Sequence, residues 1–289
     1  MNPKRFSFLH LPLIVGIFIT KDGDLMNNVN KTLYIPLYGK SYVSKKGIIL
    51  QDKQAEKIWE TKGFPLKGKA KSKWLAYYMG MRSAVFDNWL TKQISDTPDA
   101  VILHIGCGLD SRCLRISTPV QAWYDIDFPE VITERKHFFQ ESDPYHMIGA
   151  DARTLDLSAC VPQSKHAIII MEGISMYMQP DELQNLLHRL TSHFINVNFL
   201  MDCYTEFAAK ASKYKNPINE VGVTEVYGID DPLAITKNTG LDFLREHTMT
   251  PNSMIAQLDK TEQFIFKHLY SGKIADKMYR LYEYTKNQD

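Results

Sequence analysis

A glycine turn follows a short apolar run near the middle of the chain, where residues 101–105 lead into Gly106-Cys107-Gly108. A buried strand that ends in such a turn and continues into a helix presents backbone N–H groups and a helix N-terminus to a ligand. Glycine allows this close approach because a Cβ would block it. Ser111 stands where the dinucleotide pattern G-x-G-x-x-G needs its third glycine. The turn therefore favours a nucleoside without a pyrophosphate, such as S-adenosylmethionine, over a nicotinamide cofactor.

An acidic residue, Asp127, lies 19 positions beyond Gly108, at the end of a second apolar segment. In nucleotide-binding sheets an acid about 20 residues beyond the glycines accepts hydrogen bonds from the ribose hydroxyls. The sequence fits an alternative equally well. Asp127 and Glu130 have the spacing of a capping box, with Pro129 in the first turn, so the acid can be a helix cap. One carboxylate could also serve both roles.

Two further acids follow other apolar segments. Asp151 comes directly after residues 145–149, where its carboxylate or the backbone at Ala152 could contact an adenine amino group; the alternative is a cap for the turn that follows. Glu172 follows the apolar run 168–171, and because an unpaired buried carboxylate is costly, we expect it to have a partner. Parallel sheets bind ligands at the carboxyl ends of their strands, so these acids should gather at one edge.

The order of the apolar segments predicts the elements that position these residues. Short segments with strand character alternate with helical stretches, as a parallel sheet covered by helices requires. We expect helices at 73–90, 128–139 and 180–194, and strands at 101–105, 120–126, 145–149, 166–171, 197–201, 241–248 and 278–285, with a helix-like segment opening at Leu109.

Several of these segments carry longer motifs. They are GCGLDSR, WYDIDFPEVITERK (123–136), MIGADARTLDL (147–157), MEGISMYM (171–178), TLYIPLYGKS (32–41) and the helix with Met81-Arg82-Ser83. In combination they resemble the leucine carboxyl methyltransferase family, most closely its bacterial branch, which is similar to the tetracenomycin polyketide O-methyltransferases. The resemblance covers most of the chain from about Met26 onward.

The resemblance implies a Rossmann-like class I fold, with a seven-stranded, mostly parallel sheet, helices on both faces and an antiparallel last strand. It implies S-adenosylmethionine as the cofactor, with Arg82 gripping its carboxylate through the forked guanidinium. It also implies that Glu172 lies beside the methionine part of the cofactor, and Tyr177 on the loop over the site. From the residues alone, Arg82 is an ordinary packed arginine and Tyr177 a packing residue.

Composition limits the partners and the compartment. The net charge of +1 gives no electrostatic footprint for nucleic acid, and 44% hydrophobic residues provide a sizeable core. The four cysteines form no C-x-x-C pair, and no H-E-x-x-H pattern is present. We therefore expect no metal site, reduced thiols and a cytoplasmic protein.

Residues 1–25 combine a basic start with an apolar stretch, as a signal peptide does, but no small-x-small cleavage site follows. The stretch is shorter than the ~20 residues of a membrane span, and Pro12 interrupts it. We expect residues 1–25 to be a dispensable extension, and residues 26–289 to be a single methyltransferase domain with an N-terminal helical cap and no stable membrane association. A membrane anchor is the alternative.

The chemistry follows from the expected cofactor. A sulfonium already activates its methyl group, so the protein chiefly has to hold a nucleophilic oxygen in line with it. An ionised carboxylate needs no general base, whereas a hydroxyl does, and the sequence offers no clear base. If one exists, Glu172, His146 and Tyr177 are the first to test.

We therefore expect an O-methyltransferase that acts on a carboxylate, or a hydroxyl, of a small organic or polyketide-like acceptor. Segments 34–42 and 204–227 are candidates for the acceptor wall. The alternatives are a methyltransferase of a protein C-terminal carboxylate, as in the eukaryotic branch of the family, and a non-catalytic nucleotide-binding module.

Overall fold

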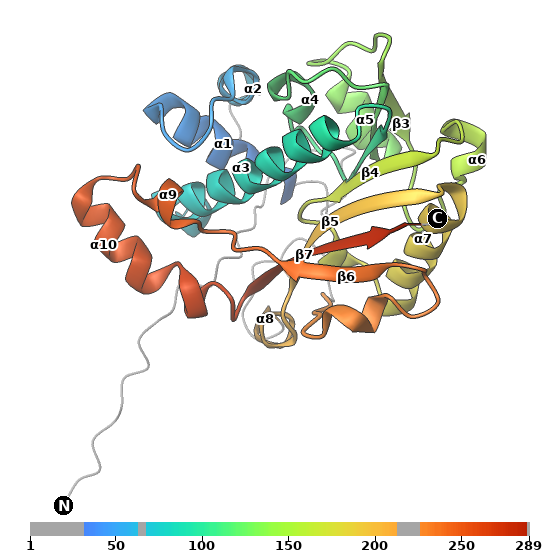
Figure 1. Cartoon of the computed structure of the whole chain (residues 1–289). Helices are drawn as coiled ribbons and strands as arrows, with labels where there is room; N and C mark the ends of the chain where they lie inside the picture. The colour runs from blue at the N-terminus through green and yellow to red at the C-terminus, as the bar shows by residue number, and fades with distance from the viewer. Residues whose placement is uncertain (1–31, 63–67, 213–225, 288–289) are drawn as a thin grey trace, which may run out of the picture.

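Seven strands form one sheet in the order β3-β2-β1-β4-β5-β7-β6 (Figure 1). The computed structural model describes residues 32–62, 68–212 and 226–287. Strands β1 to β5 pair in parallel, and β7 runs antiparallel to both of its neighbours. The strands are β1 (Val101–Ile105), β2 (Ala122–Asp127), β3 (Tyr145–Gly149), β4 (His166–Met171), β5 (Asn196–Tyr204), β6 (Asp242–Glu246) and β7 (Tyr279–Lys286). The expected Rossmann-like class I sheet with an antiparallel last strand is confirmed.

The described helices surround this sheet. They are α1 (Tyr34–Lys46), α2 (Lys53–Lys62), α3 (Lys73–Asp96), α4 (Arg112–Arg115), α5 (Pro129–Arg135), α6 (Leu157–Cys160), α7 (Pro180–His193), α8 (Glu206–Ser212), α9 (Asn252–Ile255) and α10 (Lys260–Leu269), with 3-10 turns η2 (Gly68–Lys71), η3 (Ser175–Tyr177), η5 (Pro232–Ile235) and η6 (Gly272–Ile274).

Helices cover both faces of the sheet because successive strand residues point to opposite sides. Ile168 and Ile170 of β4 belong to the core cluster that contains the buried side of α3. Ile169 and Met171 of the same strand belong to the cluster that contains the leucines of α7. In Figure 1, α3 and α7 accordingly lie on opposite sides of the sheet. The central strands are buried on both faces, which is why their sequences read as continuous apolar runs.

Three helices differ from the expected bounds. Helix α3, expected at 73–90, continues to Asp96. The helix after the glycine turn is a single turn that begins at Arg112, not Leu109. Gly108 has a positive φ and the N–H of Asp110 donates to Cys107 O, so the chain makes a further turn before the helix starts. Helix α5 ends at Arg135 rather than near residue 139, because residues 136–138 form turns.

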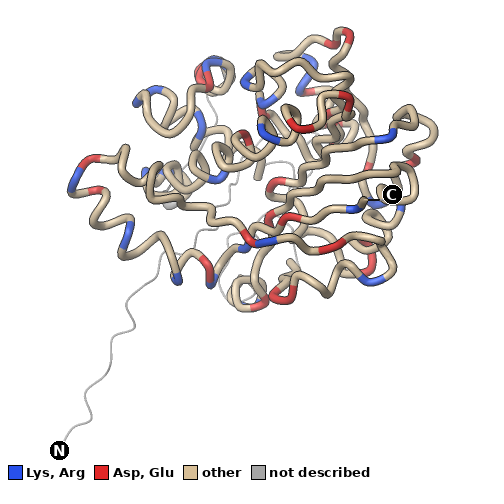
Figure 2. Tube along the Cα trace, in the orientation of Figure 1, with Lys and Arg blue, Asp and Glu red and all other residues tan. Residues whose placement is uncertain are grey.

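Acidic and basic residues are mixed along the described chain (Figure 2). Within residues 32–62, 68–212 and 226–287, no helix has the length and hydropathy of a membrane span, and no cluster of histidine, cysteine and acidic side chains could hold a metal. Helices α1 and α2 form the N-terminal helical part of the described chain. Residues 1–25 lie outside the described residues, so their dispensability stays a prediction.

Candidate active site

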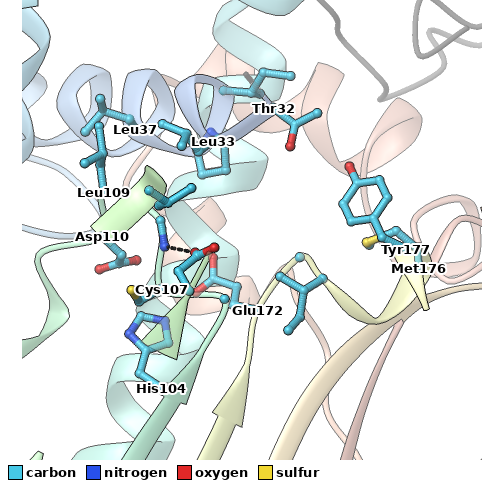
Figure 3. Close-up of a pocket in the computed structure, with 18 of the residues that line it drawn as sticks. Thr32, Leu33, Leu37, His104, Cys107, Leu109, Asp110, Glu172, Met176 and Tyr177 are labelled. Atoms are coloured by element: carbon cyan, nitrogen blue, oxygen red, sulfur yellow. Dashed lines mark hydrogen bonds between the residues drawn. The ribbon is translucent and has the colours of Figure 1, made fainter. Parts of the chain in front are cut away.

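A cavity of about 350 Å³ lies at the carboxyl ends of the parallel strands, beneath the start of α1 (Figure 3). In this view Tyr177 and Met176 lie on one side of it, Leu109 and Asp110 on the other, and Glu172 between them. The residues expected to bind the cofactor all line this one cavity, and so does Tyr177: Arg82, Gly106, Gly108, Asp127, Asp151, Ala152 and Glu172. The sheet topology brings these residues together from α3 and from the ends of four neighbouring strands.

The glycine turn requires both of its glycines. Gly106 has a φ of 73°, and a Cβ there would lie 2.2 Å from the side chain of Ile174. Gly108 has a φ of 52°; its N–H donates to Asp127 Oδ2 at 2.7 Å, and its carbonyl accepts from Arg135 at 3.0 Å. The half-buried Asp127 and the buried Arg135 therefore hold both peptide groups of Gly108, and the backbone at this position is fixed against the cavity.

Asp127 links the glycine turn to the end of β2. Its Oδ1 accepts from the Phe128 N–H at 2.8 Å, while Oδ2 accepts from Gly108. Helix α5 begins at Pro129, with Phe128 as its N-cap residue and no side-chain cap. The capping-box alternative is therefore wrong, because the carboxylate turns toward the cavity rather than toward the helix. Burial raises the pKa of Asp127, although these two N–H groups partly offset the effect.

Asp151 has the capping role that was expected as its alternative, and it also lines the cavity. Its Oδ1 accepts from the Arg153 N–H at 2.9 Å, and its carbonyl accepts from Thr154 at 3.0 Å. The Arg153 guanidinium donates to both carboxylate oxygens, and this bond lowers the pKa of Asp151. Arg153 itself lines the cavity, and the sequence analysis did not single it out.

Glu172 has the partners that its burial requires. Its Oε1 accepts from Arg82 Nε at 3.0 Å, and its Oε2 accepts from the guanidinium of Arg112 at 2.5 Å. Burial alone would raise the pKa of Glu172, but the two guanidinium groups outweigh it and lower the pKa to about 2. Glu172 is therefore ionised at neutral pH and is a poor proton acceptor, so it is no longer a good candidate for a general base.

Buried charges beyond those expected extend this network. Lys40 of α1 lines the cavity and donates to Asp110 at 2.5 Å, which ties the N-terminal helix to the glycine loop. Arg112 contacts His104 Nε2 at 3.3 Å. A guanidinium has only donors, so Nε2 accepts, and Nδ1 carries the proton 3.2 Å from Asp125. The Nε2 of His104 is thus engaged by Arg112, whereas Nδ1 lies near Asp125 without forming a hydrogen bond, although this residue lines the cavity.

The far part of the cavity is apolar and phenolic. Leu75 and Met79 of α3, Met176 of η3, Tyr204 and Tyr279 line it together with Tyr177. Burial raises the pKa of the phenols of Tyr177, Tyr204 and Tyr279, so these side chains are neutral hydrogen-bonding groups.

The two segments that the sequence predicts as the acceptor wall, 34–42 and 204–227, each supply some of the residues that line the cavity. Ile35, Pro36, Leu37 and Lys40 come from segment 34–42, and Tyr204 comes from segment 204–227. Residues 213–225 of the second segment lie outside the described residues. His146, one of the three candidate bases, stacks on Tyr124 with ring centroids 5.1 Å apart and is not among the residues that line the cavity.

Comparison with known proteins identifies the family of this chain. The family model of leucine carboxyl methyltransferases matches residues 29–191, more than half of the chain. The tetracenomycin polyketide synthesis O-methyltransferase TcmP of Streptomyces glaucescens is 30% identical over 206 residues, which cover 71% of this chain and 76% of TcmP.

A further relative and a solved structure are also similar to this chain. The S-adenosyl-L-methionine-dependent methyltransferase dpfgK of Gibberella zeae is 27% identical over 181 residues, covering 57% of this chain and 60% of that protein. A crystal structure of a Thermobifida fusca protein assigned to the methyltransferases has a TM-score of 0.53 and 12% identity, with 86% of this chain and 94% of that one covered; this likeness concerns the fold alone. The chain belongs to the leucine carboxyl methyltransferase family and is an S-adenosylmethionine-dependent methyltransferase.

Proposed function

We propose that this enzyme methylates an oxygen of a small organic acceptor, and that the oxygen belongs to a carboxylate. The observation that carries the proposal is the cavity itself. The glycine turn and the acids suited to a nucleoside follow β1, β2 and β3, whereas Tyr204 and Tyr279 belong to β5 and β7. Glu172 follows β4, which lies between these two groups of strands, and it holds Arg82. This division suits a cofactor and a second molecule that meet near Glu172.

The lining residues fit the cofactor. A Cβ at Gly106 would collide with Ile174, which agrees with a backbone shaped for close approach. We assign Asp127 to the ribose hydroxyls, the backbone at Asp151 and Ala152 to the adenine, and Arg82 to the carboxylate. When bound, S-adenosylmethionine supplies a methyl group that its sulfonium has already activated. What remains for the chain is to bind, to orient and to exclude water.

The state of the candidate bases supports a carboxylate acceptor. Two guanidinium groups hold Glu172 ionised, the lone pair of His104 Nε2 accepts from Arg112, and His146 is not in the lining. The phenols of Tyr177, Tyr204 and Tyr279 keep their protons, so they can donate to an acceptor oxygen but cannot take a proton from one. A carboxylate is ionised at neutral pH and needs only such donors.

The free thiols agree with the expected compartment. All four cysteines are unpaired, and Cys107 and Cys203 are buried. Disulfides are rare in reducing compartments, so we also propose a cytoplasmic location.

The size of the acceptor can be tested by the fate of a labelled methyl group. We expect the enzyme, supplied with methyl-labelled S-adenosylmethionine and a cell extract, to label only molecules that pass a small-pore filter. An extract stripped of small molecules should give no labelled product, with heat-killed enzyme as the control. Label retained on protein in the stripped extract would instead support the methylation of a protein carboxylate.

A further inference from the structure

Arg82 of α3 is held in one orientation by two acidic partners, one at the end of β4 and one on β5. Its Nε donates to Glu172 Oε1 at 3.0 Å, at the end of β4, and its NH1 donates to Asp202 Oδ2 at 2.9 Å, near the end of β5. Its third nitrogen has no hydrogen-bond partner among the described residues, and Arg82 lines the cavity. The two carboxylates thus use two of its five N–H donors and leave the other three, both of those on the third nitrogen included, for a ligand.

We propose that Asp202 is a positioning residue that orients Arg82 toward the carboxylate of the cofactor. The inference rests on the proposed role of Arg82 and adds to it the group that sets its geometry. Asp202 is fully buried and is not among the residues that line the cavity, so it acts through Arg82 rather than on the ligand.

Asp202 also fixes the loop on which Glu172 lies. Its Oδ1 accepts from the Gly173 N–H at 2.6 Å, and its carbonyl accepts from Ser175 Oγ at 2.5 Å. The Asp202 carboxylate therefore holds both Arg82 and Gly173, and Gly173 directly follows Glu172, the other partner of Arg82. A shift of Asp202 would move both sides of the Arg82–Glu172 ion pair.

Gly173 lies directly against the guanidinium of Arg82. It has a φ of 77°, and a Cβ there would lie 3.3 Å from both terminal nitrogens of Arg82. A side chain at this position would press on the guanidinium without changing any charge. Gly173→Ala is therefore a second way to disturb the orientation of Arg82, independent of the charge of Asp202.

The test compares two ligands that differ only at the amino-acid end. S-adenosylhomocysteine carries the carboxylate, whereas methylthioadenosine has the same nucleoside and no amino acid. We expect Asp202→Asn and Gly173→Ala each to raise the Kd of S-adenosylhomocysteine at least about tenfold, with the Kd of methylthioadenosine within about twofold, in calorimetric titrations. A general loss of structure would weaken both ligands alike.

Matched variants serve as controls. Glu283→Gln alters another buried acid with an arginine partner, on β7 and outside the cavity lining, and Gly47→Ala alters another positive-φ glycine with open space around it. Neither should change the ratio of the two Kd values. If Asp202→Asn fails to fold, Asp202→Glu takes its place, because it keeps the charge and moves the carboxylate that holds Arg82.

Each remaining outcome has a distinct meaning. If Asp202 merely competes with the cofactor for Arg82, Asp202→Asn will bind S-adenosylhomocysteine more tightly, which overturns the proposal. An unchanged ratio of the two Kd values in both variants, or an equal loss of affinity for both ligands, overturns the proposal as well.

Arg82→Leu tests the underlying assignment separately: if it leaves the ratio of the two Kd values unchanged, the proposed role of Arg82 is wrong. If Arg82→Leu lowers affinity for S-adenosylhomocysteine alone, adding Asp202→Asn should have little further effect.

Discussion

Asp127→Ala is expected to weaken S-adenosylmethionine binding by about 1–3 kcal/mol, between about 5-fold and 150-fold in Kd. The carboxylate lines the cavity and fixes the Gly108 N–H at 2.7 Å, so its removal takes away the proposed ribose acceptor and loosens the glycine turn. Since it caps no helix, we expect the free energy of unfolding to fall by only about 1 kcal/mol. Calorimetric titration and urea unfolding measure the two quantities.

Asp156→Ala is the control for this variant. Asp156 also accepts from a backbone N–H, that of Ser158, but it lies on the surface as the N-cap of α6 and does not line the cavity. Its loss should affect stability alone. Unchanged binding by a folded Asp127→Ala protein would mean that the ribose site lies elsewhere.

Glu172→Gln is expected to lower the free energy of unfolding by about 3–5 kcal/mol at pH 7, because it leaves two buried guanidinium groups without their shared counter-charge. The effect should depend on pH in a defined direction. The folded pKa of Glu172 is lowered from 4.5 to about 2, so its stabilising contribution is present above pH 4.5 and is lost as the pH falls toward 2. The difference between the two proteins should therefore shrink over that range.

Urea unfolding across this pH range provides the measurement. Glu246→Gln is a suitable control, because Glu246 pairs with Arg280 at 2.8 Å on the surface, where such pairs contribute less than about 1 kcal/mol. If Glu172→Gln is no less stable than Glu246→Gln at pH 7, the ion network does not hold the fold as its geometry indicates.

The parts of the site that the sequence predicts are those that depend on neighbouring residues in the chain. Gly106 and Gly108 follow an apolar run directly, and the spacing to Asp127 reflects one strand, one turn and the next strand. Glu172 emerges from a run that has to be buried, which is why a partner for it could be expected before the structure was known. The parallel sheet then brings all these strand ends to one edge.

The site residues that the sequence does not predict are brought into the site by tertiary packing. Lys40, Arg112 and Asp202 are buried charges that meet Asp110, Glu172 and Arg82 respectively, only after α1, α4 and β5 come together. No local pattern distinguishes them from surface charges. The helix after the glycine turn was also placed too early, because the extra turn depends on the positive φ of Gly108 and the bond from Asp110 to Cys107.

Asp127 shows the same limit of local sequence patterns, because two interpretations of this residue fit its spacing. Its spacing to Pro129 and Glu130 is that of a capping box, yet the carboxylate bonds to Gly108 from the neighbouring strand's turn. The pairing of β1 with β2 places Gly108 beside Asp127 and excludes the capping box, while the ribose contact stays a proposal.

The chemical nature of the product tests the central proposal most directly. If the acceptor is a carboxylate, the product made from methyl-labelled cofactor is a methyl ester, and mild alkali should release the label as volatile methanol. The rate should also be nearly constant with pH above the pKa of the acceptor, because no group of the enzyme has to take up a proton. Label that survives alkali would show a methyl ether, and it would contradict a site without a general base.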